Sequence, residues 1–366
     1  MNNLFSQLNK TELQIYDKIQ AKQAISIDDG IYLAKNSSLA FCAFLANSIR
    51  ERLYAKKAFF NVNTHIEISN RCVNKCKFCS FYRKKGDPDC WDLEIDDVLR
   101  FLESKSEENL TEVHLTGGLH PEKTSQFYCD LFTEIKKQFP QIHIKAFTAV
   151  EIEYFAKSDG LTTEEAISKL KTHGLNSLAG GGAEILDDKI RRKICPEKTN
   201  SETWLKVHKI AHQTGLSSNC TMLYGHIESV EDRIYHMAKL RELQEETNGF
   251  NCFIPLKYKT YGNRLNIHTE INLPEELKTY AIARIFLHNI PHIKAYWPMT
   301  GIENAALAMS YGADDMDGTI SDSTKIYSMA GSIEQKPQIS KAEMEELISL
   351  HGFVPVERDS LYYEVH

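Results

Sequence analysis

Three cysteines stand within eight residues of this chain, at Cys72, Cys76 and Cys79. Iron–sulfur clusters are normally held by four cysteine thiolates, so three thiolates on one short loop predict a cubane cluster with one iron left open. Catalytic metals, unlike structural ones, keep such an open position for a substrate or an activated ligand. The triplet therefore predicts a metal centre that takes part in a reaction.

Other interpretations of the triplet stay open. Zinc could bind if Cys90 supplied a fourth ligand, although zinc sites commonly use two Cys-x2-Cys pairs and the chain has no second pair. A metal that only stabilises a non-catalytic binding module is the alternative from another functional class. The third alternative is that the three cysteines are inert buried thiols. The remaining cysteines are expected as small core or loop residues: Cys42, Cys129, Cys195, Cys220 and Cys252.

The composition of the 366 residues is that of an ordinary globular protein, with 42% hydrophobic residues. A formal net charge of −7 without basic clusters excludes nucleic acid and anionic membrane surfaces as expected partners. The longest stretch without a charged side chain, 210–227, contains histidines and a glycine, so no membrane span is expected. Residues 1–19 carry no visible secretory signal, which predicts a cytoplasmic protein. In a reducing compartment, clustered cysteines indicate a metal or cofactor site rather than disulfide bonds.

Short β-type runs alternate with longer helical patterns from about residue 63 to about residue 317. The expected strands are Thr64–Ser69, Glu112–Thr116, Ile142–Thr148, Ser177–Ala179, Ser218–Leu223, Cys252–Pro255, Ile293–Tyr296 and Asp314–Met316. The expected helices between them are Ile95–Glu103, Thr124–Gln138, Thr163–His173, Ser201–Thr214, Val230–Thr247, Pro274–Asn289 and Ile302–Ser310. Because parallel strands need helical crossovers, the alternation predicts an α/β fold, a (β/α)8 barrel of the TIM type.

Three regions are expected along the chain. Residues 1–62 show repeated apolar positions and are predicted to form a helical N-terminal segment packed on the barrel. The barrel itself spans 63–320. Residues 321–366 are predicted to form a polar C-terminal extension with a helical pattern at Lys341–His351. Barrel enzymes build their sites at the carboxyl ends of the strands, so the loops there are the place to look for further functional residues.

The cysteine loop carries an aromatic residue, Phe78, directly before its third cysteine. In this pattern it resembles the radical S-adenosylmethionine (SAM) superfamily. The resemblance implies a [4Fe–4S] cluster on the three cysteines, with SAM chelated to the open iron and Phe78 beside the cofactor. One electron from the reduced cluster would release a 5′-deoxyadenosyl radical, while the protein orients the cofactor and excludes water and oxygen.

Two later motifs lie where this superfamily has SAM contacts. Gly117 and Gly118 follow the second strand and resemble the glycine motif whose backbone approaches the SAM amino group, which glycine permits because it lacks a Cβ. A simple tight turn is the alternative. Tyr-Gly-His-Ile-Glu at 224–228 resembles the segment along the adenine, with Tyr224 and Ile227 as its contacts.

Acidic residues at other strand ends are further candidates. Glu151 and Glu184 could bind the ribose hydroxyls or the ammonium of the methionine moiety, or they could pair with Lys145 or Arg192. The acidic residues of the eighth strand are assigned no chemistry and are expected as a polar floor or rim: Asp314, Asp315 and Asp317.

Three longer stretches narrow the resemblance: 178–185, 191–198 and 219–228. Over about residues 60–320 the chain is similar to the radical SAM enzymes of the futalosine pathway of menaquinone synthesis, and to the aminofutalosine synthase family in particular. The resemblance implies that SAM is consumed as a substrate. Its adenosyl radical would add to the vinyl carbon of 3-[(1-carboxyvinyl)oxy]benzoate, giving 6-amino-6-deoxyfutalosine and methionine, with flavodoxin or ferredoxin as electron donor.

Two related families stay open as alternatives. Dehypoxanthine futalosine cyclases share the triple glycine at 180–182 but favour Ser-Pro where this chain has Cys195-Pro196. Deazaflavin (FO) synthase subunits share Ile-Cys-Pro but tend to break the glycine run. The Gly-Leu-His-Pro sequence at 118–121 also suits the synthase better than the cyclase.

The implied substrate has two carboxylates, which arginine binds best through its planar fork. Arg83, Arg191 and Arg264 stand at predicted strand ends and are the candidates, each with a surface ion pair as its alternative. His226 is a candidate for binding a carboxylate or moving a proton, because its side chain can hold either protonation state near neutrality. With Arg191 and Glu184 it forms the predicted catalytic set.

Overall fold

A curled parallel sheet forms the centre of the protein in the computed structural model, which describes residues 8–320, 325–332 and 337–365. In it each strand pairs with the next one along the chain. The strands are β2 (Asn63–Glu67), β3 (Glu112–Thr116), β4 (His143–Ala146), β5 (Ser177–Leu178), β6 (Ser217–Tyr224), β7 (Phe250–Lys257) and β8 (His292–Ile293). All seven lie at predicted positions, which confirms the expected α/β alternation.

A second sheet closes the curled one and contains, in spatial order, β10 (Val354–Glu357), β1 (Lys57–Asn61) and β9 (Asp315–Gly318). β1 runs into β2 after a single residue, and one parallel bridge between Lys294 and Asp315 joins β8 to β9. The eight predicted strands are all present, but they do not form one continuous ladder. The pairing of β9 with β1 is irregular, and Asp317 within β9 has a φ of +69°, which bends this strand away from regular pairing.

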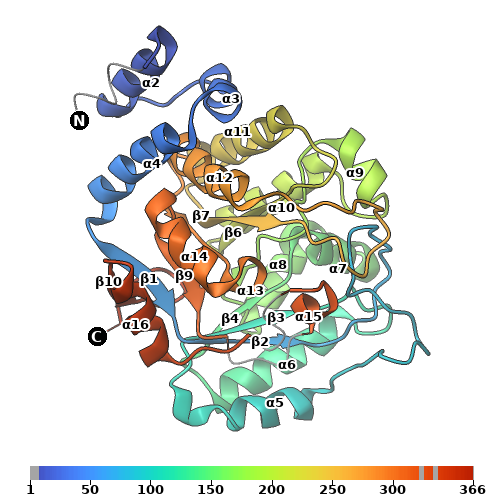
Figure 1. Ribbon diagram of the computed structural model, residues 1–366. Coiled ribbons are helices and arrows are strands. Elements are labelled where there is room, and N and C mark those ends of the chain that lie inside the picture. The colour runs from blue at the N-terminus through green and yellow to red at the C-terminus, as the bar shows by residue number, and fades with distance from the viewer. Residues whose placement is uncertain (1–7, 321–324, 333–336, 366) are drawn as a thin grey trace.

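Helices surround the strands on the outside (Figure 1). They are α5 (Ile95–Glu103), α6 (Ser125–Gln138), α7 (Ala149–Asp159), α8 (Thr163–Thr172), α9 (Asp188–Ile194), α10 (Ser201–Gln213), α11 (Val230–Thr247), α12 (Leu273–Phe286), α13 (Trp297–Thr300) and α14 (Ile302–Ala308), with 3-10 turns at Ser106–Glu108 and Met309–Tyr311. Each predicted helix is confirmed within a few residues. Thr162 and Ser229 begin α8 and α11 with capping boxes, which satisfy free backbone N–H groups of the first turn.

Helix α7 was not expected from the sequence. It begins directly after β4, because Thr148 is its N-cap and Glu151 is the third residue of a capping box. No turn residues separate the strand from the helix, so the change in periodicity lacks the usual punctuation. The Glu151 carboxylate therefore has a structural task at the start of α7.

The N-terminal region contains α2 (Lys10–Gln20), α3 (Ile27–Asn36) and α4 (Leu39–Tyr54), and α4 packs along α12. The expectation of helix up to residue 62 is wrong at its end, where β1 begins at Lys57. Phe60 is fully buried there, and β1 is paired on both sides, as is usual for a strand covered on both faces. Residues 1–7 of the predicted segment lie outside the described residues.

The C-terminal region contains α15 (Ile326–Met329), α16 (Lys341–Leu350) and β10. The predicted helical pattern at Lys341–His351 is confirmed as α16. Arg358, directly after β10, donates from Nε to the Asp315 carboxylate at 2.7 Å, so the tail supplies a buried cation to β9. Residues 321–324, 333–336 and 366 of the predicted extension lie outside the described residues.

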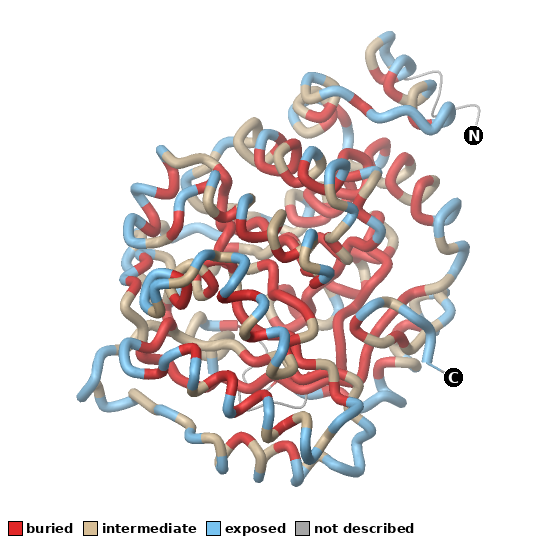
Figure 2. The backbone as a smooth tube through the Cα atoms, turned by 180° about the vertical axis from the view of Figure 1, so that it is seen from behind, coloured by how far each residue is buried: buried red, intermediate tan, exposed pale blue. Residues whose placement is uncertain are grey.

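Buried residues follow the strands and the inward faces of the helices, while exposed residues lie along the outer surface (Figure 2). All five residues of β2 are buried. None of the helices in the described part of the chain has both the length and the apolar character that crossing a bilayer would need.

Candidate active site

The three clustered cysteines lie on the loop that follows β2. Cys76 is buried, whereas Cys72 and Cys79 are half-buried. The Lys77 N–H donates to the carbonyl of Ile194, at the end of α9, at 2.7 Å. The loop is thus fastened to a neighbouring element at the carboxyl end of the sheet.

Burial and a nearby cation act in opposite directions on the thiols. Burial raises the pKa of Cys72 and of Cys76, and the Lys198 ammonium lowers both. Cys79 interacts electrostatically with each of the other two cysteines, so the three sulfurs lie near one another. Iron binds the thiolate form, and the charge of a bound cluster would supply the stabilisation that burial removes. The donor set fits a cubane cluster held by three cysteines.

The glycine turn after β3 is packed against the start of the cysteine loop. Gly117 has a φ of +144°, and a Cβ there would lie 2.7 Å from the Ser69 carbonyl oxygen. A Cβ at Gly118 would overlap the Arg71 carbonyl. These glycines are therefore required by the close approach of two backbones within the protein.

The residue after this turn contacts a cluster-binding candidate directly. The Leu119 N–H donates to Cys72 Sγ at 3.3 Å, and the Leu119 carbonyl accepts from the Val73 N–H at 2.9 Å. Hydrogen bonds to ligating sulfurs are one of the means by which proteins set the potential of iron–sulfur clusters. The glycine motif thus acts on the predicted cluster through Leu119.

Glu184, Lys198 and Phe78 form one group beside the cysteines. Lys198 Nζ lies 2.5 Å from the Glu184 carboxylate and 5.3 Å from the centre of the Phe78 ring. Burial alone would lower the pKa of Lys198, but the Cys76 and Glu184 charges raise it well above its usual value. Two of the predicted cofactor-binding residues, Glu184 and Phe78, therefore both lie beside Lys198, which the sequence analysis did not select. Arg192 is not the partner of Glu184.

Glu151 lies in the first turn of α7, after β4, and His226 lies in the loop after β6; both side chains are engaged by the backbone. The Glu151 carboxylate accepts from the Thr148 N–H at 2.8 Å, and burial raises its pKa. His226 Nδ1 accepts from the Ile227 N–H at 2.7 Å, and its Nε2 lies 3.1 Å from the Leu223 carbonyl. Burial lowers the pKa of His226. Its ring nitrogens are thus occupied within its own turn.

Tyr224 and Ile227 differ in exposure. Tyr224 is fully buried, and the Arg233 guanidinium of α11 lies 5.3 Å from its ring centre. Ile227 is 40% exposed, at the surface of the loop after β6. The structure thus places the Tyr224 ring beside Arg233 of α11, one of the helices that cover the sheet.

All three candidate arginines lie near the rim, but each uses its donors within the protein. Arg83 forms a two-point ion pair with Asp89, at 2.6 Å from both nitrogens. Arg191 is buried and donates only to carbonyls, those of Gly182, Ala183 and Thr199. Arg264 donates to the Lys75 carbonyl at 2.8 Å and so steadies the cysteine loop. Arg83 and Arg191 thus have no free fork for a substrate carboxylate, whereas Arg264 bonds to described residues through a single side-chain nitrogen, Nη2.

A cavity of about 140 Å³ lies inside the barrel, at the carboxyl ends of the strands. Its polar and charged lining residues are His65, Glu112, His114, Thr116, Lys145, Thr148, Asn219, Thr221, Lys294, Tyr296, Asp317 and Tyr327. Ile254 and Leu256 of β7 form an apolar wall, and Gly180 and Gly181 leave room after β5. The interior cavity thus combines a polar side with an apolar side.

Two buried ion pairs line the interior cavity. Lys145 pairs with Glu112, and Lys294 pairs with Asp317, with all four side chains almost fully buried. Burial would raise the pKa of Glu112, but Lys145 holds it well below its usual value. The expectation that Asp317 belongs to a polar floor or rim is confirmed, and Lys145 is not the partner of Glu151. Within each pair the lysine and the carboxylate neutralise each other, so the cavity carries little net charge.

Two histidines lie between these ion pairs and the rim. The rings of His65 and His114 meet edge to face, with centres 4.8 Å apart. Burial lowers the pKa of each to about 3, so both are neutral near pH 7. His114 Nε2 is buried without a hydrogen-bond partner among the described residues.

The sequence analysis missed the residues that form this interior. His65 and His114 were assigned to strands, and Lys294 received no role. A usable signal was present, because a polar side chain in the middle of a buried parallel strand needs a partner inside the barrel. Spacing along the chain carries no such information, since the partners come from different strands.

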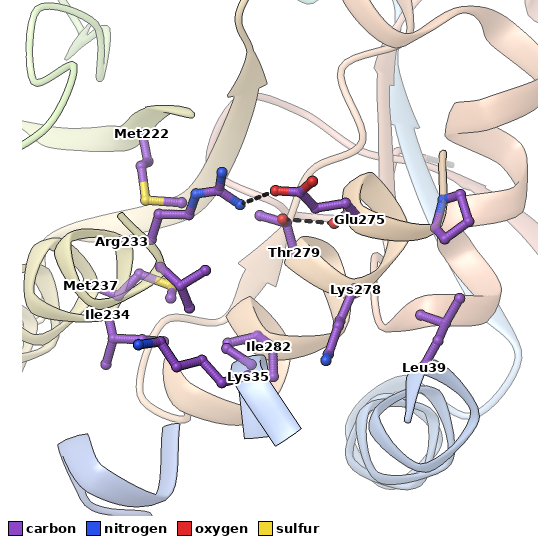
Figure 3. Close-up of a pocket in the computed structure, with 13 residues that line it drawn as sticks. Lys35, Leu39, Met222, Arg233, Ile234, Met237, Glu275, Lys278, Thr279 and Ile282 are labelled. Atoms are coloured by element: carbon purple, nitrogen blue, oxygen red, sulfur yellow. Dashed lines mark hydrogen bonds and ion pairs between the residues drawn. The ribbon is translucent and has the colours of Figure 1, made fainter. Parts of the chain in front are cut away.

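A larger cavity of about 600 Å³ lies outside the barrel, between α3, α4, α11 and α12 (Figure 3). It is lined by apolar side chains such as Met222 and Ile282, and Arg233 pairs with Glu275 across it at 3.0 Å. Thr221 faces the interior of the barrel, whereas its neighbour Met222 faces this outer cavity. Neither cavity is lined by a predicted site residue. The interior cavity is the candidate active site because it lies inside the barrel, at the end of the strands from which the cysteine loop leaves.

The chain is similar to known proteins over nearly its whole length. The chain matches the radical SAM superfamily over residues 66–240 and the CofH/MqnC C-terminal region over 247–365. It is 40% identical over 360 residues to the aminodeoxyfutalosine synthase of Thermus thermophilus, with 96% of this chain and 95% of that protein covered. Identity to the aminodeoxyfutalosine synthase of Streptomyces coelicolor is 38% over 363 residues, covering 96% and 93%. The cyclic dehypoxanthine futalosine synthase of Streptomyces coelicolor is 37% identical over 362 residues, covering 96% and 89%.

Solved structures share the fold. Methylornithine synthase superposes with a TM-score of 0.75 at 17% identity, covering 93% of this chain and 97% of that chain. The FeFe-hydrogenase maturase HydG from Carboxydothermus hydrogenoformans has the same TM-score and identity, covering 96% and 80%. At such identities the similarity concerns the fold alone.

Proposed function

We propose that this chain, which belongs to the radical SAM superfamily, acts as an aminodeoxyfutalosine synthase. It would join the adenosyl group of SAM to 3-[(1-carboxyvinyl)oxy]benzoate, with loss of one carboxyl carbon, and release 6-amino-6-deoxyfutalosine and methionine. The observation that carries the proposal is the 40% identity to such a synthase over nearly the full length of both chains. The cysteine loop and the interior cavity at one end of the barrel support it.

Cys72, Cys76 and Cys79 would hold a [4Fe–4S] cluster, and the open iron would take SAM. When bound, the reduced cluster and SAM supply a 5′-deoxyadenosyl radical. Leu119 steadies the cluster through its N–H donation to Cys72 Sγ, and Lys198 places a positive charge beside the thiolates. These residues favour the ligating form of the sulfurs and fix the loop.

The interior cavity would receive the aromatic substrate. Ile254 and Leu256 offer an apolar wall for the ring, and the polar side opposite offers hydrogen-bond donors. Tyr296 and Tyr327, the latter on α15, line the cavity too. A substrate inside the barrel would have little contact with bulk water, which protects a reactive radical from side reactions.

The protein would work in the cytoplasm with a flavodoxin or a ferredoxin as electron donor. The family resemblance implies such a donor, and a three-cysteine loop is typical of a protein in a reducing compartment. Mixing the reconstituted protein with each reduced donor, SAM and substrate identifies the donor by the rate of product formation.

The second candidate is dehypoxanthine futalosine cyclisation, favoured by the 37% identity to the cyclic dehypoxanthine futalosine synthase. The two activities are separated by mass spectrometry of the products. Anaerobically reconstituted and reduced protein, given SAM and the enolpyruvyl benzoate, is expected to form aminodeoxyfutalosine. Inertness with that substrate, together with turnover of dehypoxanthine futalosine, would assign the cyclase activity.

A further inference from the structure

One side chain in the interior cavity lacks a partner. Among the described residues that line the cavity, His114 is the one whose side chain has a fully buried polar atom, Nε2, with no hydrogen bond. A neutral imidazole carries one N–H donor and one acceptor nitrogen. A buried polar group without a partner costs free energy unless a ligand or an ordered water supplies one. Nε2 itself has almost no accessible surface, and no described residue bonds to Nδ1 either, so the half-buried edge of the ring that lines the cavity can be offered to a bound molecule.

Charged groups of both signs surround His114. Lys145 and His65 lower the pKa of His114 beyond the effect of burial, whereas the Glu112 and Asp317 carboxylates raise it. Both lysines of the cavity already have carboxylate partners, Glu112 and Asp317. An incoming carboxylate would thus meet a neutral N–H donor beside two ion pairs, both of which stay intact.

Asn219 supplies a second donor on another strand. It lines the same cavity from β6, and the structure gives its amide no hydrogen bond to a described residue. Ile254 and Leu256 of the adjacent strand β7 line the cavity next to it. An aromatic ring that bears a carboxylate matches this combination of an apolar wall with two neutral donors.

The depth of His114 decides which end of the substrate it meets. β3 ends at Thr116, and the turn that follows brings Leu119 to Cys72. His114 lies two residues before the strand end, roughly 7 Å deeper along the strand. The reacting vinyl group must lie near the cluster loop, so the opposite end of the molecule reaches toward His114.

We propose that His114 and Asn219 bind the ring carboxylate of the aromatic substrate and thereby determine specificity for a benzoate. This inference rests on the proposed function, because it takes its substrate from there. His114 acts as a neutral donor through the ring edge that faces the cavity, and the enolpyruvyl carboxylate is bound elsewhere, closer to the cluster loop.

The test compares two ligands on two variants. Binding is measured by calorimetry with reconstituted, unreduced protein and SAM, so that no turnover occurs. The ligands are 3-[(1-carboxyvinyl)oxy]benzoate and 2-phenoxyacrylate, which lacks the ring carboxylate. His114→Phe is expected to weaken binding of the benzoate by about 10-fold or more. The affinity for 2-phenoxyacrylate should change by no more than about twofold. His114→Gln, which keeps a donor at a similar reach, should recover most of the affinity.

His208 provides the matched control, because it is a buried histidine whose Nδ1 is bonded to Ser218, outside the cavity. His208→Phe should leave both affinities unchanged. If His114→Phe fails to fold, Asn219→Leu takes its place and should show the same selective loss.

Each result decides the matter. An equal loss for both ligands would make His114 a structural residue and overturn the proposal, as would an unchanged affinity for the benzoate. Turnover of the enolpyruvyl benzoate by the unmodified protein is measured alongside. If that turnover occurs while His114→Phe binds normally, the specificity proposal alone is wrong. If it does not occur, the proposed function fails and this inference fails with it.

Discussion

The rim and the floor of the barrel cavity are built in opposite ways. At the rim, the cysteines, the glycine turn and Leu119 come from two short segments and are joined through backbone groups. At the floor, Lys145, Glu112, Lys294 and Asp317 come from four strands and are joined through side chains.

This difference matches what each end must do. A cluster with several strong metal–sulfur bonds needs thiolates at a fixed position, which a backbone-bonded loop provides. A substrate pocket needs an interior that is polar without being charged, and paired ions with neutral histidines provide that. Changes at the rim should therefore abolish the chemistry with little effect on folding, whereas changes at the floor should first affect stability.

The largest expected effect is at the rim. Cys76→Ala removes one of three iron ligands, so cluster assembly and turnover should be abolished. The barrel should stay folded, because a loop ligand contributes little to the core. Iron analysis and far-ultraviolet circular dichroism measure the two properties. A global loss of helicity would point to a structural metal and remove the contrast between rim and floor.

At the floor, Lys145→Met leaves the Glu112 carboxylate buried without its cation. We expect the free energy of unfolding to fall by about 3–5 kcal/mol, as measured by urea denaturation of the cluster-free protein. The double variant Lys145→Met/Glu112→Gln should recover most of that loss, because it removes the buried charge as well. A loss of less than about 1 kcal/mol in the single variant would mean that the pair is open to solvent.

Gly118→Ala tests how the two rim segments are joined. The added Cβ would overlap the Arg71 carbonyl, and neither backbone can move without shifting the cysteine loop. Overpacking of this kind costs about 1–3 kcal/mol, and cluster content should fall with it. Gly160→Ala is the control for cluster content, since a Cβ there meets no atom within 4 Å. Its left-handed φ of +69° should cost alanine about 1–2 kcal/mol of stability, but the cluster content should stay unchanged. Equal behaviour of the two variants would show that close packing at Gly118 is unimportant.

The smallest effect expected for a single residue is the pH dependence of stability that His65 and His114 cause. Burial lowers the pKa of His65 and His114 to about 3, while an unfolded chain takes up a proton on each near pH 6.5. Between these values the unfolded state binds more protons, so stability falls as the pH falls. Each histidine should contribute about 1.4 kcal/mol per pH unit below 6.5. Urea midpoints measured from pH 7 to pH 5 should fall less steeply for His114→Phe than for the unmodified protein, and identical slopes would contradict a neutral buried His114.

The same difference explains what could be predicted from the sequence. The cysteine loop and the glycine turn are contiguous, so their spacing is visible in the chain, and the strands that carry them alternate regularly with helices. The floor depends on which side chains of different strands point inward, and a one-residue change in strand register would move each of them to the other face. Arg191 shows the reverse case, because a residue that looks like a carboxylate binder is used to bind three carbonyls.

The central claim is that the adenosyl group of SAM is built into the product. The direct test follows SAM labelled with carbon-13 at the 5′ position, incubated with reduced, reconstituted protein and 3-[(1-carboxyvinyl)oxy]benzoate. We predict that the label appears in 6-amino-6-deoxyfutalosine, in equal amount to the methionine released. Recovery of the label only in 5′-deoxyadenosine would contradict the claim, because SAM would then have supplied a hydrogen-abstracting radical and no part of the product.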